Sequence, residues 1–470
     1  MTQVTHSAAA RSLLDRAIAQ SLDSSPGKPG GFLGSPGTLP CRRPRGRGRD
    51  SSDRRDLLLA AWMRLPFDRT LAIHVLNARL GDPSRSPWPS VRGTRSRAAA
   101  EADPVDEALI VMIAAELWRW GTPWGDIAGV LPRVDRALDR IVHADRDRDG
   151  FVERGSTGVA WAEDQGYVYA AYRARATLAR ASGDPDTAAC WDDAAQGIQQ
   201  HANHAFWLPA AGGFASALDS SNNPVTVAGA EIGQCLWTGL IDEDKAGALV
   251  THLLSSDTFC GWGLQSRADA DELPDPGLRV IRPHENAIVA AGLARYGYRT
   301  EAFRVAQTQL AAADSFAGLL PASFLADPRT AVGAPHHRRL DPLGLRRGAP
   351  QECASPYPPT ASSAATPLLL LRALLGLDAN VPEGTVHLRP AVPACYLPLT
   401  VEDVLIGQER VTVRLPASTD EPPTVSGLPE HVSLAPERLE HHPLTLTWQT
   451  ATSLLARGSA PQRPAAVAHN

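Results

Sequence analysis

The chain has 470 residues, of which 43% are hydrophobic, and a formal net charge of −5. This composition excludes a globally disordered chain, and the near-neutral charge without a basic stripe argues against a nucleic-acid-binding protein. The length allows two or three domains, or one large domain with an appendage.

The sequence shows no sign of secretion or membrane insertion. Residues 1–23 lack the long apolar run of a signal peptide, and no segment reaches the roughly 18 apolar residues of a membrane span. The six cysteines are scattered and form no CxxC pair, which favours reduced thiols over a zinc site or a disulfide framework. We therefore expect a cytoplasmic protein that does not bind membranes.

The first segment in chain order, residues 1–52, is expected to be irregular and partly disordered, because 24–49 are rich in Gly, Pro and Arg and have almost no periodicity. From residue 53 to 380, apolar residues recur at three- and four-residue spacing, which predicts α-helices. The predicted helices span 56–66, 68–80, 104–121, 129–144, 162–182, 185–206, 228–239, 243–255, 285–297, 300–313 and 362–376.

The arrangement of these helices follows from their connections. Ala-rich helices joined in antiparallel pairs indicate a mainly α protein, either a closed toroid or a solenoid. The sequence has no fixed repeat period, which argues against a simple solenoid. Two long irregular stretches, 269–282 and 327–359, interrupt the helices; loops of this length are uncommon unless they are functional or disordered.

The pattern changes after residue 380. Residues 385–388 and 410–415 alternate between apolar and polar side chains, as strands do. We expect a small β appendage over 381–450 and a disordered tail over 451–470.

The most distinctive segment contains Asp145, Asp147 and Asp149 at alternate positions, followed by Gly150. Alternate carboxylates before a glycine match the first half of a calcium loop, in which they converge on one hard cation. The twelfth position of such a loop should be Glu, and here it is Ser156. The segment is therefore either a structural Ca²⁺ site or an Asp-rich turn whose side chains bind local amides.

The same segment, residues 145–153, resembles the D-x-D-G-D-G-F-V-E-Y turn of bacterial amylo-α-1,6-glucosidases, which are glycoside hydrolases of the glycogen-debranching type. Further motifs resemble those of this family in the same order, and together they cover about residues 48–415. They lie at 48–51, 105–106, 118–120, 163–170, 206–207, 217–219, 233–239, 261–263, 282–288, 293–297 and 388–390.

The resemblance implies a fold and a chemistry. The fold is an (α/α)6 toroid, the six-hairpin glycosidase fold, with a sugar pocket at one mouth. The partner is a carbohydrate, either an α-glucan or a small α-glucoside, and no cofactor is required. Two carboxylic acids share the reaction: one protonates the leaving oxygen, and the other activates a water molecule on the opposite face of the sugar.

The sequence departs from the family at both acids. The N-Q-G-W-K-D-S segment that carries the expected general acid is missing between Glu153 and Glu163, and Ala322 stands at the position of the expected base. We therefore expect impaired hydrolysis, with Glu163 and Glu285 as candidate substitutes. The alternative is an inactive homologue that binds carbohydrate or serves as a scaffold. A shifted reading frame in 24–49 and 328–360 would also explain lost motifs.

Several other residues are candidates to contact the sugar through hydrogen bonds or aromatic stacking. Structural interpretations compete with this one: Asp50 and Asp106 suit helix caps, Trp237 suits the core, and His284 suits a structural pair with Glu285. The predicted substrate-binding residues are Arg49, Asp50, Asp106, Gln165, Tyr167, Trp237, Trp262 and His284.

Overall fold

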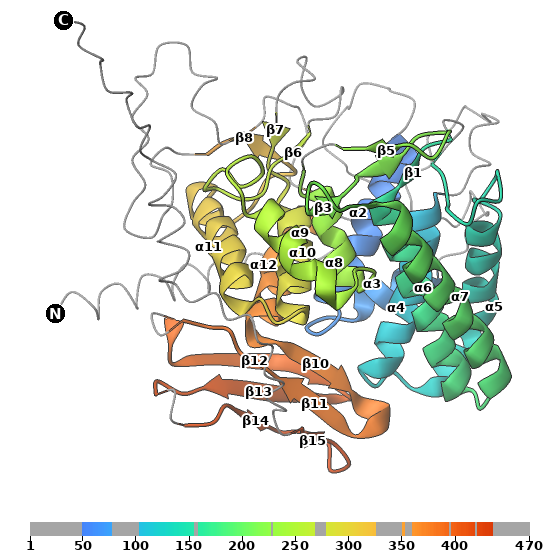
Figure 1. Cartoon of the computed structure of the whole chain (residues 1–470). Helices are drawn as coiled ribbons and strands as arrows, with labels where there is room; N and C mark the ends of the chain where they lie inside the picture. The colour runs from blue at the N-terminus through green and yellow to red at the C-terminus, as the bar shows by residue number, and fades with distance from the viewer. Residues whose placement is uncertain are drawn as a thin grey trace, which may run out of the picture. The chain divides into compact units, whose positions relative to one another are not determined.

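Helices dominate the structure, as the spacing of apolar residues predicts (Figure 1). The computed structural model describes residues 49–77, 103–154, 158–226, 229–267, 279–325, 350–352, 360–393, 396–418 and 421–435, without the side chains of 49–53, 267 and 351–352. All of these residues belong to one unit, Met1–Ala435. The predictions for residues 1–48 and for the tail 451–470 lie outside the described residues.

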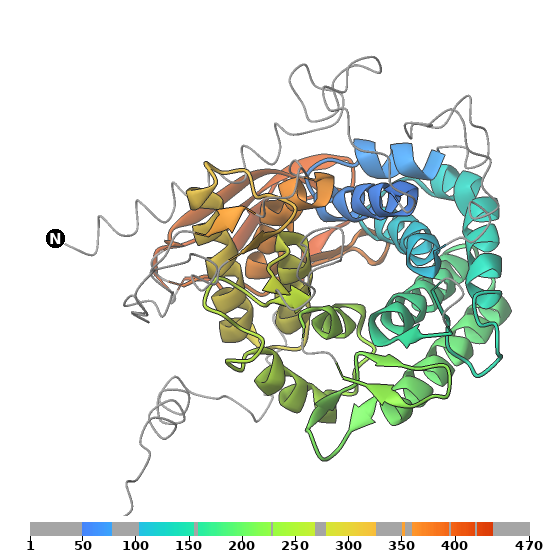
Figure 2. The ribbon, with the colours of Figure 1, turned by 90° about the horizontal axis from the view of Figure 1, so that it is seen from above.

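Within the described residues, six helices follow one another around a closed ring (Figure 2). Each packs against the next, and the last packs against the first, so the ring closes between segments that are far apart in the sequence. These helices are α2 (Arg49–Arg64), α4 (Pro104–Arg119), α6 (Ala162–Ala181), α8 (Gln234–Thr238), α10 (Pro283–Arg295) and α12 (Ala361–Leu375).

A second set of helices packs against the ring, and its residue pattern explains why it lies outside. Helix α5 buries a single stripe, whereas α4 and α12 are buried on nearly every side. Helices α3, α5, α7 and α11 pack against α2, α4, α6 and α10, respectively. Helix α9 packs against the 3₁₀ turn η2 (Glu231–Gly233) and strand β3 (Gly213–Phe214). The set comprises α3 (Thr70–Asn77), α5 (Trp124–Val142), α7 (Pro185–Ala205), α9 (Glu243–Leu253) and α11 (Arg299–Ser315).

The middle of the first ring helix meets the start of the last one. Asp56 of α2 accepts hydrogen bonds from the backbone amides of Ala361 at 2.8 Å and Ser362 at 3.1 Å, so a side chain of the first ring helix caps the last. Arg55 pairs with Asp103, whose carboxylate caps α4 by accepting from Val105 N. The starts of α4 and α12 therefore lie at one end of the ring, beside the middle of α2.

At the C-terminal ends of α4 and α12, charged side chains connect the two helices. Arg372 of α12 donates to Glu116 of α4 at 2.5 Å, and its guanidinium lies 5.0 Å from the centroid of the Trp120 ring. Arg119 donates to Glu116 at 3.0 Å and to Asp378 at 2.6 Å. Structural contacts therefore join α4, α12 and the start of β10 at this end.

Among the described residues, one three-stranded sheet and three strand pairs lie in the connections between helices, and two three-stranded sheets follow α12. The first set comprises β1 (Ala160–Trp161), β4 (Ala217–Leu218) and β5 (Pro224–Val225), then the pairs β2 (Trp207–Leu208) with β3 (Gly213–Phe214), β6 (Ser266–Arg267) with β7 (Arg279–Val280), and β8 (Phe324–Leu325) with β9 (Gln351–Glu352). The later sheets are β10 (Leu377–Asn380), β11 (Thr385–Leu388) and β15 (Ser433–Leu434), and β12 (Leu399–Ile406), β13 (Glu409–Leu415) and β14 (Thr424–Ser426).

The β12–β13 hairpin packs directly against the helices. Gly407 at its tip donates to Trp120 O at 3.0 Å. A Cβ atom on Gly121, which has a φ of 91°, would lie only 2.6 Å from the Cα of Gly407. This close approach requires glycine at position 121.

The structure refines several of the predicted boundaries. The predicted strands at 385–388 and 410–415 are found, but the β region begins at Leu377, before the expected residue 381. The predicted helix 228–239 is a 3₁₀ turn, η2 (Glu231–Gly233), followed by the short α8. Helix α2 already begins at Arg49, inside the segment expected to be irregular. In the part of the chain that the structure describes, no helix has the length and apolar character needed to cross a membrane.

Candidate active site

The starts of three successive ring elements bring polar side chains together in a group that we name the mouth cluster. Its members are Glu163, Glu231, Gln234, Arg282 and Glu285. Glu163 lies in the first turn of α6, Glu231 opens η2, and Glu285 lies in the first turn of α10. Acidic residues are favoured in first turns because the helix dipole stabilises negative charge there.

Glu163 is held by two neighbours. Arg154 Nη2 donates to its Oε1 at 2.5 Å, and Gln234 Nε2 donates to its Oε2 at 3.0 Å. The Tyr167 hydroxyl donates to Gln234 Oε1 at 2.7 Å, which fixes the orientation of that amide. Glu163 therefore accepts one hydrogen bond from a cation and one from an oriented amide.

Behind Glu163, a fully buried carboxylate shares the same arginine. Asp164 also accepts a hydrogen bond from Arg154, and burial raises the pKa of Asp164 to about 6 despite that attraction. On α4, Asp106 pairs with Arg55 at 3.4 Å and with Arg54 at 3.7 Å, and burial raises its pKa to about 6. The first pair joins the loop before α6 to that helix, and the second joins α2 to α4.

Glu231 and Glu285 share a guanidinium. Arg282 Nη1 lies 3.5 Å from Glu285 Oε1 and 4.0 Å from Glu231 Oε1, and Ser266 donates to Glu285 Oε2 at 2.5 Å. Burial, followed by the negative charges of Glu285 and Glu163, raises the pKa of Glu231 to about 8. The mouth cluster thus contains one carboxyl group that is mostly protonated at neutral pH, beside two that accept charge-assisted hydrogen bonds.

Several of the predicted binding residues are buried and contact other residues of the fold. Gln165 is fully buried and donates to Val152 O at 2.9 Å and Trp161 O at 3.0 Å, which uses both hydrogens of its amide. Trp237 lies in the core, with its ring centroid 4.2 Å from that of Trp62 and 5.6 Å from that of Tyr167. In this conformation both side chains are engaged in contacts within the fold.

Of the other predicted binding residues, two have described side chains and two do not. His284 is half-buried in the first turn of α10, next to Glu285. Trp262 is mostly buried between Gly261 and Gly263, and its carbonyl accepts from Gln309 at 3.0 Å. Arg49 and Asp50 begin α2, and their side chains are outside the described residues.

The Asp-rich segment folds into a loop that concentrates carboxylates. Asp145, Asp147, Asp149 and Glu153 place one carboxylate oxygen each within 4.8 Å of one another. Asp145 Oδ1 is buried and has no hydrogen-bond partner among the described residues. Glu153, in the ninth position of the loop, supplies the acid that Ser156 in the twelfth does not. Oxygen donors in this arrangement suit Ca²⁺.

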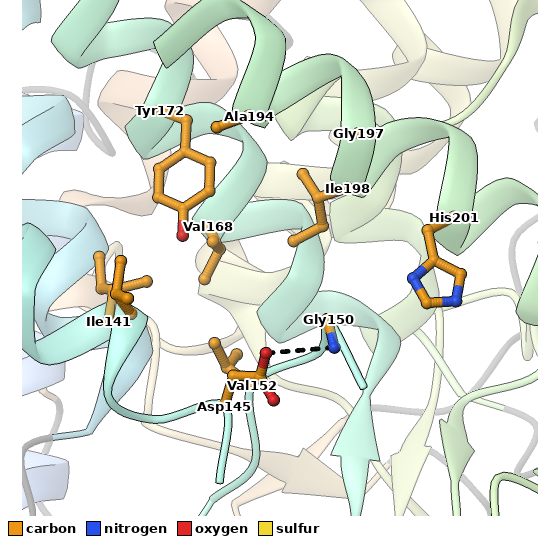
Figure 3. Close-up of a pocket in the computed structure, with 11 residues that line it drawn as sticks. Ile141, Asp145, Gly150, Val152, Val168, Tyr172, Ala194, Gly197, Ile198 and His201 are labelled. Carbon is orange, nitrogen blue, oxygen red and sulfur yellow. Dashed lines mark hydrogen bonds between the residues drawn. The ribbon is translucent and has the colours of Figure 1, made fainter. Parts of the chain in front are cut away.

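A cavity of about 260 Å³ lies beside this loop, among α5, α6 and α7 (Figure 3). Its walls are largely aliphatic, with Ile141, Val168 and Ile198, and Asp145 lies at its edge, where it accepts from Gly150 N at 3.1 Å. Burial, followed by the charge of Asp145, raises the pKa of Tyr172 to about 12. No member of the mouth cluster lines this cavity, so the two places are separate.

The comparisons with known proteins concern the part of the chain that carries both places. Residues 131–319 match the model of the mannosylglycerate hydrolase MGH1-like glycoside hydrolase domain. All five members of the mouth cluster and the Asp-rich loop lie inside this match. No curated protein sequence matches the chain.

Two solved structures share the fold at low sequence identity. A sialidase is 12% identical, with a TM-score of 0.53, and the match covers 70% of this chain and 32% of that one. A GH78 family rhamnosidase of Bacillus sp. GL1 is 15% identical, with a TM-score of 0.51, covering 82% of this chain and 39% of that one. The chain thus spans well under half the length of either. Together with the family match, these similarities support a glycoside hydrolase fold.

The sequence did not single out Glu231, Gln234, Arg282 or Arg154 as individual site residues. One signal was available: Glu163, Glu231 and Glu285 are each the acidic residue near the start of a predicted helix. If ring helices start at the same end, such acids converge. Arg154 could not be found this way, because its partners are nine and ten residues away, across a loop.

Proposed function

We propose that the protein is an amylo-α-1,6-glucosidase-like glycoside hydrolase that acts on α-glucans or small α-glucosides. The observation that carries the proposal is the convergence of Glu163, Glu231 and Glu285 at the end of the ring where the helices start. We further propose that the ring is an (α/α)6 toroid of the six-hairpin type. Its closed series of helix contacts and the family match support this assignment.

The chemistry of glycoside hydrolysis fits this cluster. The reaction needs one carboxyl group that is protonated and one that is ionised, flanking the scissile bond. In the proposal, carboxyl groups of the mouth cluster substitute for the two expected acids. The lost base position, Ala322, is close by in the fold, because Phe324 pairs through its backbone with Ile281, next to Arg282.

We propose that turnover is slow. Glu163 is engaged by Arg154 and Gln234, and Glu285 by Ser266 and Arg282, so both carboxylates must exchange contacts to act on a substrate. The same contacts favour a second candidate function, in which the mouth binds carbohydrate without cleaving it. In either case His284 and Trp262 are proposed to contact the sugar, the protein is proposed to be cytoplasmic, and Ca²⁺ is proposed to bind at the Asp-rich loop.

Release of glucose from isomaltose, panose and limit dextrin tests the proposal. The wild-type protein should release glucose, and Glu163→Gln and Glu285→Gln should each lower the rate by about 10²-fold or more. Glu243→Gln, on the exposed first turn of α9, is the matched control and should leave the rate unchanged. Sugar binding by calorimetry without glucose release would replace hydrolysis with the second candidate, and neither binding nor release would refute both.

A further inference from the structure

We propose that Glu231 is the proton donor of the mouth cluster, an inference that rests on the proposed function. The argument begins with the unequal surroundings of the three glutamates. Glu163 and Glu285 each accept hydrogen bonds at both carboxylate oxygens from fixed donors. Glu231 has a longer ion pair, with 4.0 Å between its Oε1 and Arg282 Nη1.

The charges around Glu231 also favour its protonated form. Two carboxylates near Glu231 oppose its ionisation, and the single guanidinium that it shares with Glu285 lies closer to Glu285. A proton therefore stays on Glu231 when the other two are ionised, since like charges in a partly buried site resist a third. The pKa of about 8 agrees with this geometry.

Accessibility separates the three groups further. The side chain of Glu231 is 27% exposed, compared with 12% for Glu163 and 10% for Glu285. A proton donor must come within hydrogen-bond reach of the glycosidic oxygen, so the most accessible member of the cluster is the suitable one.

The proposed step conserves atoms and charge. The Glu231 carboxyl proton moves to the glycosidic oxygen as the bond between that oxygen and C1 breaks, and the bonding electron pair goes to the leaving oxygen. A water oxygen bonds to C1 and gives its proton to the Glu285 carboxylate. The products are a reducing sugar and an alcohol. Proton exchange with solvent then returns Glu231 to its acid form and Glu285 to its carboxylate.

Gly229 offers a way to move the Glu231 carboxyl group without removing it. A Cβ atom on Gly229 would lie 1.9 Å from Glu231 Oε2, so the carboxyl group folds over this glycine. Because that oxygen is the end of a flexible side chain, Gly229→Ala should displace it at small cost to the fold. Gly129→Ala on α5 is the matched control, since nothing lies within 4 Å of the added atom.

The experiment compares two substrates with different leaving groups. Cleavage of isomaltose needs a proton donor, because its leaving group is a sugar alcohol. Cleavage of 2,4-dinitrophenyl α-glucoside needs none, because 2,4-dinitrophenolate is stable as an anion. Glu231→Gln should lower kcat/KM on isomaltose by about 10²-fold or more and leave the dinitrophenyl substrate within a few-fold. The fall in kcat/KM of the wild type near pH 8 should disappear in this variant. Gly229→Ala should show the same selectivity, with an unchanged melting temperature.

The outcomes are distinguishable. If the wild type cleaves isomaltose and Glu231→Gln does so equally well, the inference is wrong and the proposed function stands. If a folded Glu231→Gln loses both substrates equally, Glu231 is not the donor. If the variant does not fold, Gly229→Ala decides, and equal losses on both substrates overturn the inference. If the wild type cleaves neither substrate, the proposed function is wrong, and the inference that rests on it is wrong as well.

Discussion

Arg69 donates a hydrogen bond of 2.7 Å to the carbonyl oxygen of Gly407, joining the start of the helical region to the tip of a β-hairpin 338 residues later. The same guanidinium donates to Trp120 O at 2.6 Å and to Leu405 O at 3.1 Å. Burial lowers the pKa of Arg69 to about 10. One buried cation thus satisfies three backbone carbonyls from two parts of the fold.

Arg69→Ala should destabilise the whole unit. Its removal takes a donor from three carbonyl groups, of which Trp120 O keeps the amide of Gly407. Each buried polar group that loses its partner costs about 1 to 3 kcal/mol, so we expect the free energy of unfolding to fall by at least about 2 kcal/mol, measured by urea denaturation. Arg410→Ala, on the exposed face of the same hairpin, is the control. An effect of Arg69→Ala no larger than that of the control would contradict this role.

Arg154→Met should destabilise the protein more at high pH than at low pH. Asp164 is fully buried, its pKa is already raised to about 6, and Arg154 is the cation that opposes the rise. Without Arg154 the pKa of Asp164 in the folded protein rises further. The stability that protonated Asp164 contributes is complete below its unfolded pKa near 3.8, and more of it is lost as pH increases. Breaking a buried pair costs about 3 to 5 kcal/mol. Urea denaturation at pH 4 and pH 8 measures the difference.

A partly exposed pair provides the control for Arg154. Arg175 of α6 lies 2.8 Å from Asp135 of α5, and the Asp135 side chain is largely exposed. Surface pairs contribute about 0 to 1 kcal/mol, so Arg175→Met should have a small effect at both pH values. Equal losses for the two variants would show that Arg154 is not a structural cation.

Glu231→Gln should stabilise the protein at alkaline pH. The folded pKa of Glu231 is about 8 and its ordinary value is 4.5, so the folded state binds the proton more tightly than the unfolded state. The contribution of protonated Glu231 to the free energy of unfolding is fully present below pH 4.5 and is lost as pH rises through 8. Since Gln cannot ionise, the variant should have a higher urea midpoint than the wild type at pH 9, and the advantage should shrink at pH 5. Glu243→Gln should show no such pH dependence.

Calcium should raise the melting temperature. The loop formed by Asp145, Asp147, Asp149 and Glu153 concentrates negative charge that a divalent cation would neutralise. At a free Ca²⁺ concentration 100 times the dissociation constant, binding adds about 2.7 kcal/mol of stability. Differential scanning fluorimetry with CaCl₂ and with EDTA measures the shift. Asp147→Asn should abolish it and Asp244→Asn should not; a shift of equal size in both variants would place the ion elsewhere.

The sequence predicted the ring helices well except for α8, because buried helices such as α12 have apolar residues on every side. It predicted the β region less well at its start, since Leu377–Asn380 has no strand signal and pairs only because β11 returns beside it. Glu163 and Glu285 were predicted through motifs. Glu231 was missed because its chemistry depends on charges 54 and 68 positions away in the chain, which local pattern does not reveal.

The cap that Asp56 provides for α12 sets an order of events during synthesis. Asp56 leaves the ribosome 305 residues before Ala361, the amide that it binds. Until α12 has been synthesised, the ring cannot close between α10 and α2, and the apolar surface that α12 covers favours aggregation. A chain truncated before α12 should therefore keep an open ring.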